Sequence, residues 1–344
     1  MIDLRSDTVT LPTKEMKEFM FNAPLGDDVF GEDPSINTLQ EKSSILFGKD
    51  KALFVPSGTM ANFISVLSHC DRGEELLLGN QSHIFKYEAG GTSTFGGVHS
   101  YQLHNNDDGT INIDDIIGNI RDDRDDHYPK TKLLCLENTH NSCYGSAIPK
   151  QYFNDVKKAI QPYNIKLHID GARIFNAAIA LNCTVKDLAQ SADSITFCLS
   201  KGLACPSGSI ILGSTNFIKK AKRIRKALGG GMRQAGILAS AGIFALDNMV
   251  SRLKEDHQNA IIMANKLKQI KNIELDTDKV STNLIFFYLK KESLSDDDFI
   301  NQLLKNKIKI DSKGNRKFRI AMHNGFNASM IDNVIHAIQM VLNN

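Results

Sequence analysis

The run SITFCLSKGLACPSGS contains the residue whose chemistry is most unusual for its setting. Lys201 follows directly on an apolar segment, and Gly202 follows the lysine. Burying an ammonium costs several kcal/mol, so lysines rarely end a buried strand. Such a lysine can be a salt-bridge partner, or it can be a desolvated amine that forms a Schiff base with a carbonyl carbon. Taken alone, the segment slightly favours the salt bridge.

A second segment, HIDGAR (168–173), places a carboxylate where ligands often bind. Asp170 ends an apolar run, and Arg173 lies in the first turn after it. Ligands of open α/β sheets bind at the carboxyl ends of the strands. A carboxylate there could bind a metal ion, cap a helix or pair with a ring nitrogen, and capping by Asp is common.

Two further segments could contribute to the same kind of site. PSGTMAN (56–62) indicates a strand, a turn and a helix start, whose free N–H groups attract anions and whose Gly58 permits close approach of the backbone. A plain turn with a Ser or Thr cap is the more frequent alternative. SHIFKYEAGG (82–91) supplies His83, which could be an ordinary surface histidine or an aromatic plate on a cofactor ring. The glycine-rich motifs GxGxxG and GxxxxGK[ST] do not occur.

Together the four segments describe one kind of site. A phosphate cradle, an aromatic plate, an acid at a strand end and a lysine on a later strand are what pyridoxal phosphate needs. The acid keeps the pyridine nitrogen protonated, so that the ring accepts electrons, and the lysine binds the cofactor covalently. No metal site is assigned.

The elements between these residues predict an α/β fold. Short apolar runs alternate with amphipathic ones, which indicates βαβ units and a mostly parallel sheet. The predicted strands are 51–57, 74–80, 132–138, 166–170 and 194–200, with helices over 59–70 and 149–163. The run 207–214 follows its predecessor too closely for a parallel crossover, so we expect it to pair antiparallel.

The pattern changes near residue 230, which predicts a second domain. We expect a large domain over 1–245 and a small α+β domain over 246–344. The predicted elements of this later part are a helical stretch over 233–270 with a break near Asp247, strands at 283–289 and 317–322, and helices at 295–306 and 329–342 with Ser295 and Ser329 as N-caps.

In the strand KFRIAM (317–322) a period of two separates Arg319 from its apolar neighbours. Phe318 and Ile320 are expected on the core side, and Arg319 on the other face. A solvated arginine is the common outcome for such a position.

Composition excludes several partners and compartments. Lys and Arg number 41 against 39 Asp and Glu, a net charge of +2. This charge is too small to predict binding to nucleic acid or to an anionic membrane surface. The six cysteines form no CxxC pair, as expected for reduced thiols. The start MIDLRSDTVT is too charged for a signal peptide, and apolar runs stay short of the ~18 residues of a membrane span. We therefore expect a cytoplasmic protein with a small-molecule substrate.

Six longer motifs carry a family resemblance over nearly the whole chain. They are DLRSDTVT (3–10), GDDVFGEDP (26–34), LENTHN (136–141), HIDGARIFNA (168–177), CLSKGL (198–203) and GGGMRQAG (229–236). With these motifs the chain resembles the low-specificity L-threonine aldolases, a branch of the fold-type I pyridoxal-phosphate enzymes. The resemblance implies a transferase-like large domain, a small C-terminal domain and a homotetramer built from tight dimers.

The resemblance also implies roles for individual residues. Lys201 is the Schiff-base lysine and Asp170 the partner of the pyridine nitrogen. The remaining cofactor contacts are expected from Ser57, Gly58, Thr59, His83 and Arg173. The substrate carboxylate is expected to meet Ser6, Arg173 and Arg319, so that the substrate bridges both domains. Glu88 is expected to assist proton transfer, and His127, Lys226 and Arg233 to lie near the site, some of them from a neighbouring subunit.

The implied reaction is cleavage of L-threonine or L-allo-threonine to glycine and acetaldehyde, through an external aldimine and a quinonoid. Four candidates remain for the base that removes the β-hydroxyl proton: His83, His127, Glu88 and a bound water. One departure is Phe30, where a tyrosine is expected. Other fold-type I activities, such as β-elimination or transamination, are alternatives because one fold hosts many chemistries. A cofactor-binding or assembly protein without catalysis is a further alternative, which the intact set of Lys201, Asp170 and Arg319 disfavours.

Overall fold

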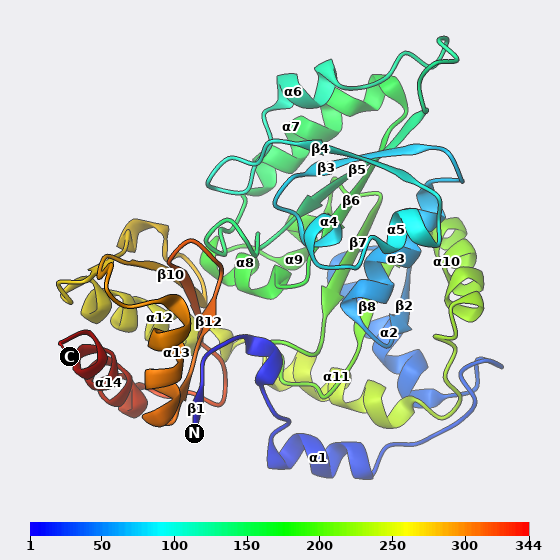
Figure 1. Ribbon diagram of the computed structural model, residues 1–344. Coiled ribbons are helices and arrows are strands. Elements are labelled where there is room, and N and C mark those ends of the chain that lie inside the picture. The colour runs from blue at the N-terminus through cyan, green and yellow to red at the C-terminus, as the bar shows by residue number, and fades with distance from the viewer. Residues whose placement is uncertain (344) are drawn as a thin grey trace.

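The computed structural model describes residues 1–343 and contains two bodies, each with its own sheet and apolar core (Figure 1). The large body is built on a seven-stranded sheet and the small one on a four-stranded sheet. Among the described residues, no helix is both long and apolar enough to cross a lipid bilayer.

The large sheet has the order β2-β8-β7-β6-β5-β3-β4. Its strands are β2 (Lys51–Val55), β3 (Glu75–Gly79), β4 (His99–Leu103), β5 (Thr131–Glu137), β6 (Lys166–Asp170), β7 (Ser194–Cys198) and β8 (Ser209–Gly213). Only β8 runs against its neighbours: it pairs antiparallel with both β2 and β7, whereas the pairs from β7 to β4 are parallel. The expected antiparallel strand is therefore confirmed. The edge strand β4 was not predicted, because its residues HSYQL are mostly polar and only its last one is buried.

Helices cover both faces of this sheet (Figure 1). One face carries α3 (Gly58–His69), α4 (His83–Lys86), α5 (Gly91–Thr94) and α10 (Thr215–Ala227). The other carries α2 (Pro34–Phe47), α6 (Ile113–Gly118), α7 (Lys150–Ile160), α8 (Ile174–Ala180), α9 (Val185–Ala189) and α11 (Gly236–Asn248), with α1 (Lys14–Phe21) packed on α11. Strands covered on both faces must be apolar throughout, which explains their continuous apolar runs. Stacked Phe47 and Phe197 rings, 5.0 Å apart, pack in the core beneath the second face.

The small body combines an antiparallel sheet with three helices. Its elements are β9 (Ile273–Glu274), β10 (Leu284–Leu289), β12 (Asp311–Ser312), β13 (Lys317–Ala321), α12 (Leu253–Lys268), α13 (Asp296–Lys305) and α14 (Ile331–Asn343). The break expected near Asp247 is confirmed, since α11 ends at Asn248. Ser295 caps α13 by accepting a hydrogen bond from the Asp298 N–H. The Ser329 cap is wrong: a 3₁₀ turn over Ala328–Met330 precedes α14, and Asn327 caps that turn.

The N-terminal segment belongs to the small body as much as to the large one. Strand β1 (Ile2–Asp3) pairs in parallel with β11 (Ile308–Lys309), and Leu4 is part of the small core. The domain boundary after residue 245 stays a prediction, and that residue lies within α11.

Strand β13 shows the expected alternation. Phe318 and Ile320 lie in the small core, whereas Arg319 points away from it. The Arg319 side chain is not solvated, however, because it is buried against the large body.

A buried carboxylate links three segments of the large body, and this gives a prediction. Asp33 caps α2 and accepts hydrogen bonds from the N–H groups of Ile36 (3.0 Å), Gly26 (3.2 Å) and Gly236 (2.9 Å). Asp33→Ala leaves these buried donors without a partner, so we expect the free energy of unfolding to fall by about 3 kcal/mol. The control, Ser295→Ala, removes an exposed cap and should lower it by about 1 kcal/mol. Urea unfolding followed by circular dichroism measures both, and equal losses would contradict the linking role.

Candidate active site

A cavity of about 200 Å³ lies between the carboxyl ends of the central strands and the small body. It is lined by Ser6, Thr8, His83, Tyr87, Asn141, Arg173, Lys201, Lys313 and Arg319. Lys201 comes three residues after the end of β7, and Arg173 three residues after the end of β6. The structure therefore brings together five residues that the sequence predicts for one site: Ser6, His83, Arg173, Lys201 and Arg319.

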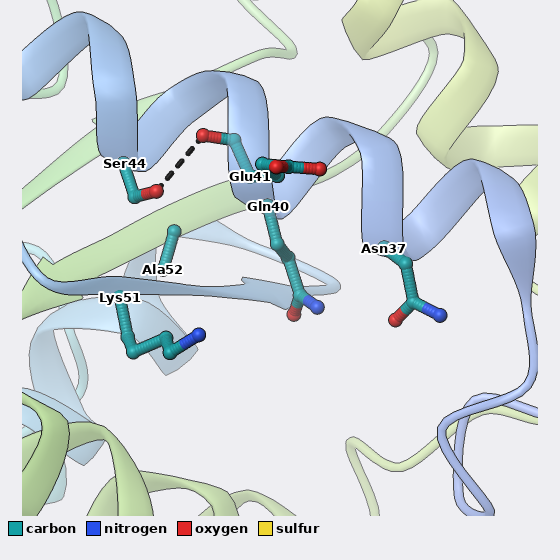
Figure 2. A pocket seen from close by; sticks show the side chains of 6 residues that line it. All are labelled: Asn37, Gln40, Glu41, Ser44, Lys51 and Ala52. Atoms are coloured by element: carbon teal, nitrogen blue, oxygen red, sulfur yellow. Dashed lines mark hydrogen bonds between the residues drawn. The ribbon is translucent and has the colours of Figure 1, made fainter.

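Three larger hollows lie elsewhere among the described residues, and Lys201, Arg173 and Arg319 line none of them. One of about 390 Å³ lies between α2 and β2 and is lined by Asn37, Gln40, Glu41, Ser44, Lys51 and Ala52 (Figure 2). It adjoins the amino end of the edge strand β2, whereas the candidate site adjoins the carboxyl ends of central strands. Ligands of such sheets bind at the carboxyl ends, so the size of this hollow does not make it the candidate site.

Asp170 lies at the end of β6, where it is buried and both of its carboxylate oxygens accept hydrogen bonds. One carboxylate oxygen accepts from the Ala172 N–H (3.0 Å) and the other from Asn62 Nδ2 (2.8 Å). Burial alone would raise the pKa of Asp170, but the positive charges of His83 and Lys201 outweigh it and lower that pKa. The site thus contains a carboxylate that stays ionised in a buried position.

His83, at the start of α4, forms a pair with Glu88. Its Nδ1 lies 2.8 Å from Glu88 Oε1, and that oxygen also accepts from Asn62 Nδ2 (2.8 Å). Burial would lower the pKa of His83, but the hydrogen bond to Glu88 and the charge of Asp170 raise it. Burial and the nearby Asp170 also raise the pKa of Glu88. The ligand atoms of His83, Glu88 and Asp170 lie within 4.8 Å of one another, a set that could also meet a metal ion.

A buried ion pair orients the arginine side of the cavity. Arg173 donates to Asp7 through Nε and Nη2, both at 2.7 Å, and through Nη1 to Asn141 Oδ1 (3.1 Å). Burial alone would raise the pKa of Asp7, but the Arg173 guanidinium outweighs it and holds that pKa well below its usual range. Asn283, on the small body, also donates to Asp7 (3.2 Å).

Arg319 reaches the same Asn141 from the small body. Its Nη1 donates to Asn141 Oδ1 (2.8 Å) and its Nη2 to the Arg5 carbonyl (2.8 Å), while its buried Nε has no partner among residues 1–343. Burial and the like charge of Arg173 lower the pKa of Arg319. Two guanidinium groups that converge on one amide oxygen make a site for an anion.

The start of α3 is the predicted phosphate cradle. Ser57 accepts from the Met60 N–H (3.2 Å) as the N-cap, which leaves other backbone N–H groups of the first turn free of helical partners. A Cβ on Gly58 would lie 2.7 Å from Cys198 Sγ, so any other residue here would force the Cys198 thiol to move. Cys198 ends β7, which places Gly58 and Thr59 beside the strand that leads to Lys201.

Three predicted residues lie outside this cavity. His127 is on an exposed loop and bonds to Asp125 (2.7 Å). Lys226, on α10, lines a different hollow, and half-exposed Arg233 pairs with Asp27 (2.9 Å). Within one chain the structure does not bring these residues to the site.

Several contact residues were not assigned from the sequence. Asp7 and Asn141 lie in the segments DLRSDTVT and LENTHN, whose polar content could have indicated them. Asn62 lies on α3, four residues after Gly58, and its inward direction follows only from the packing of α3 on the sheet. Tyr87 and Lys313 line the cavity from loops without a sequence signal.

Comparisons with known proteins show the family to which the chain belongs. A model of the family described as Beta-eliminating lyase matches residues 3–291. Low-specificity L-threonine aldolase 1 of Arabidopsis thaliana is 44% identical, over 99% of this chain and 96% of that protein. The low specificity L-threonine aldolase of Escherichia coli (strain K12) is 47% identical, over 85% of this chain and 86% of that protein.

The chain belongs to the low-specificity L-threonine aldolases. Solved structures support the fold of this aldolase at lower identity. A threonine aldolase of Leishmania major superposes with a TM-score of 0.82 at 18% identity, over 99% of this chain and 100% of that one. A putative L-allo-threonine aldolase from Listeria monocytogenes gives 0.81 at 16% identity, over 99% and 96%.

The pair of His83 and Glu88 gives a prediction for this aldolase that does not depend on activity. In Glu88→Gln the imidazole loses the carboxylate that opposes its burial, so we expect the pKa of His83 to fall. A titration of the histidine ring signals by NMR measures it. The control Glu41→Gln, in the hollow between α2 and β2, should leave that pKa unchanged. An unchanged pKa in Glu88→Gln would show that Glu88 does not set the charge of the ring.

Proposed function

We propose that this protein uses pyridoxal phosphate to cleave L-threonine and L-allo-threonine into glycine and acetaldehyde. The observation that carries the proposal is that Lys201 lines one cavity with Arg173 and Arg319, and that its charge acts on the buried carboxylate of Asp170. A lysine nucleophile, an acid partner and an anion grip at the carboxyl ends of the strands are the parts that this lyase reaction requires.

The residues present fit the cofactor. Lys201 would bind its aldehyde carbon, Asp170 its ring nitrogen and His83 its ring face. Its phosphate would meet Ser57, Gly58 and Thr59, where a side chain on Gly58 would crowd the Cys198 thiol. When bound, pyridoxal phosphate supplies an electron sink for the pair released as the Cα–Cβ bond breaks. The lowered pKa of Asp170 suits that role, because an ionised carboxylate favours a protonated ring nitrogen.

The arginines are suited to hold the substrate carboxylate. Arg319 Nε is buried without a partner, and the Nη1 atoms of Arg173 and Arg319 already share Asn141. Asp7 keeps the guanidinium of Arg173 in place through two hydrogen bonds. Ser6 lines the same cavity and adds a hydroxyl. Fixing the carboxylate at these points orients the bond that breaks.

His83 is the residue we propose to accept the β-hydroxyl proton. Its Nδ1 is engaged by Glu88, so the neutral ring presents Nε2 as an acceptor. A raised pKa of His83 favours uptake of the proton by the ring, as a general base requires. Glu88 would fix the tautomer and stabilise the ring after it takes up the proton.

Three residues that the sequence analysis assigns to the site, but that lie elsewhere in their own chain, support a homotetramer built as a dimer of dimers. His127, Lys226 and Arg233 lie away from the cavity of their own chain and would reach the site of a neighbouring subunit. Phe30 is exposed beside Arg233, with its ring 5.7 Å from the guanidinium, and would lie at that interface. We also propose a cytoplasmic location, which the six unpaired cysteines support.

Lys201→Ala tests the central assignment. Without the amine, the purified protein should lose the visible absorbance of bound cofactor and nearly all release of glycine from threonine. Lys51→Ala, in the hollow between α2 and β2, is the control and should keep both. The same assay distinguishes β-elimination, which would release ammonia and 2-oxobutanoate. A borohydride-reducible link to another lysine in the Lys201→Ala protein would refute the assignment.

Arg319→Ala tests the substrate grip across the two bodies. A charge-assisted hydrogen bond in a partly desolvated cavity contributes roughly 1.5–3 kcal/mol. Because about 1.4 kcal/mol is tenfold, kcat/KM for threonine should fall at least tenfold. Cofactor absorbance should change little, and exposed Arg124→Ala is the control. Unchanged efficiency would exclude substrate contact, and loss of cofactor would assign Arg319 to the fold or to cofactor binding.

A further inference from the structure

A second cavity adjoins the candidate active site. It measures about 120 Å³ and shares Tyr87, Asn141, Lys313 and Arg319 with the first cavity. Its other lining residues are Gln81, Lys86, Ser142, Phe286 and Lys317. The two cavities therefore meet along one wall, which includes the arginine proposed to hold the substrate carboxylate.

The second cavity is strongly basic. Three lysines and Arg319 line it, and none of its lining residues is acidic. Lys313 pairs with Asp311 (2.5 Å), and Lys86 donates to Gln81 Oε1 (2.9 Å), so both already have polar partners. Lys317 differs from them, because within residues 1–343 it forms no ion pair with a carboxylate.

The charge of Lys317 also acts on Asp107, which pairs with Lys279, but the Lys317 ammonium itself contacts aromatic rings. It lies 4.5 Å from the centre of the Tyr144 ring, 4.9 Å from that of Phe286 and 5.6 Å from that of Tyr288. Such contacts stabilise a cation without neutralising it, so its charge remains available to a ligand. The rings also lower the local dielectric, which strengthens an ion pair formed there.

A buried hydroxyl belongs to Ser142, a residue that lines the same cavity. Ser142 Oγ is buried and has no hydrogen-bond partner among the described residues. Buried polar atoms are nearly always satisfied, so an unpaired hydroxyl in the wall of a cavity points to a ligand. Gln81, Asn141 and Ser142 come from the large body and Lys317 from the small one, so a ligand here would contact both.

We propose that the second cavity is a subsite for a carboxylate at the end of the substrate's side chain. The inference rests on the proposed function and specifies its substrate class: β-hydroxy-α-amino acids with an acidic side chain. The α-carboxylate stays on Arg173 and Arg319, and the side-chain carboxylate meets Lys317 and Ser142. The reaction is unchanged: the Cα–Cβ bond breaks, the β-hydroxyl loses its proton as the aldehyde forms, and Cα takes up a proton. The products are glycine and an aldehyde that carries a carboxylate.

Three pairs of substrates test the proposal on the holoenzyme, because each pair differs only in the side-chain charge. They are β-hydroxyaspartate with β-hydroxyasparagine, 3-hydroxyglutamate with 3-hydroxyglutamine, and 4-carboxyphenylserine with 4-carbamoylphenylserine. Release of glycine gives kcat/KM for each. For the spacing that reaches Lys317, we expect the acid to be preferred over its amide at least tenfold.

Variants then assign the preference to Lys317. Lys317→Gln should reduce it below threefold, and Lys317→Arg, which retains the charge, should restore most of it. Lys279→Gln is the matched control: this lysine also lies 4.5 Å from the centre of the Tyr144 ring, but it pairs with Asp107 and lines neither cavity. It should keep the wild-type preference.

Threonine, assayed with the same enzyme, separates the two proposals. If threonine is not cleaved, the proposed function itself is wrong. If threonine is cleaved but no pair shows a preference for the acid, the subsite is refuted while the aldolase activity stands. A preference that persists in Lys317→Gln would equally overturn the assignment to Lys317.

Discussion

The buried pair of Asp7 and Arg173 is the interaction on which the rest of the site depends. Asp7 comes from the N-terminal segment and Arg173 from the end of β6, and two hydrogen bonds of 2.7 Å join them. Asn283 of the small body donates to the same carboxylate. Removing two charges from water costs free energy, which offsets much of the attraction between them. The main effect of such a pair is therefore to favour one arrangement of the chain over others. Here it fixes the arginine that faces the cavity and joins three parts of the chain.

Asn62 has a comparable role on the other side of the cavity. Its amide nitrogen donates to both Asp170 and Glu88, and its oxygen accepts from Thr196 Oγ1 (3.1 Å). Two buried carboxylates would repel each other, and a shared donor lets them lie close together. Asp170 has a lowered pKa and stays ionised, whereas Glu88 is hydrogen-bonded to His83. The two carboxylates therefore have different roles: Asp170 is suited to pair with a ring nitrogen, and Glu88 to orient the proton acceptor His83. The neutral amide of Asn62 thus holds both carboxylates in place.

Much of the fold was predictable from patterns local in sequence. The strands of the large sheet that are covered on both faces are continuous apolar runs, and the short link before β8 required an antiparallel pair. The alternation in β13 gave the direction of Arg319. Strand β4 and the pairing of β1 with β11 escaped prediction, because edge and two-residue strands lack an apolar signature. The Ser329 cap failed because an intervening 3₁₀ turn gave that role to Asn327.

The sequence by itself determined the chemical parts: a lysine after β7, an acid at the end of β6 and a glycine at the start of α3 are properties of short segments. Tertiary structure alone decided which residues meet them. The hydrogen bonds that join Asp7 to Arg173, Asn62 to Asp170 and Asn141 to Arg173 span 166, 108 and 32 positions, and no local pattern encodes such separations. Packing against Asn141 and Arg5 also buries Arg319 at the cavity, where the strand pattern alone would leave it in solvent. The physical reason is that desolvation and charge pairing depend on what packs against a residue, not on its neighbours in sequence.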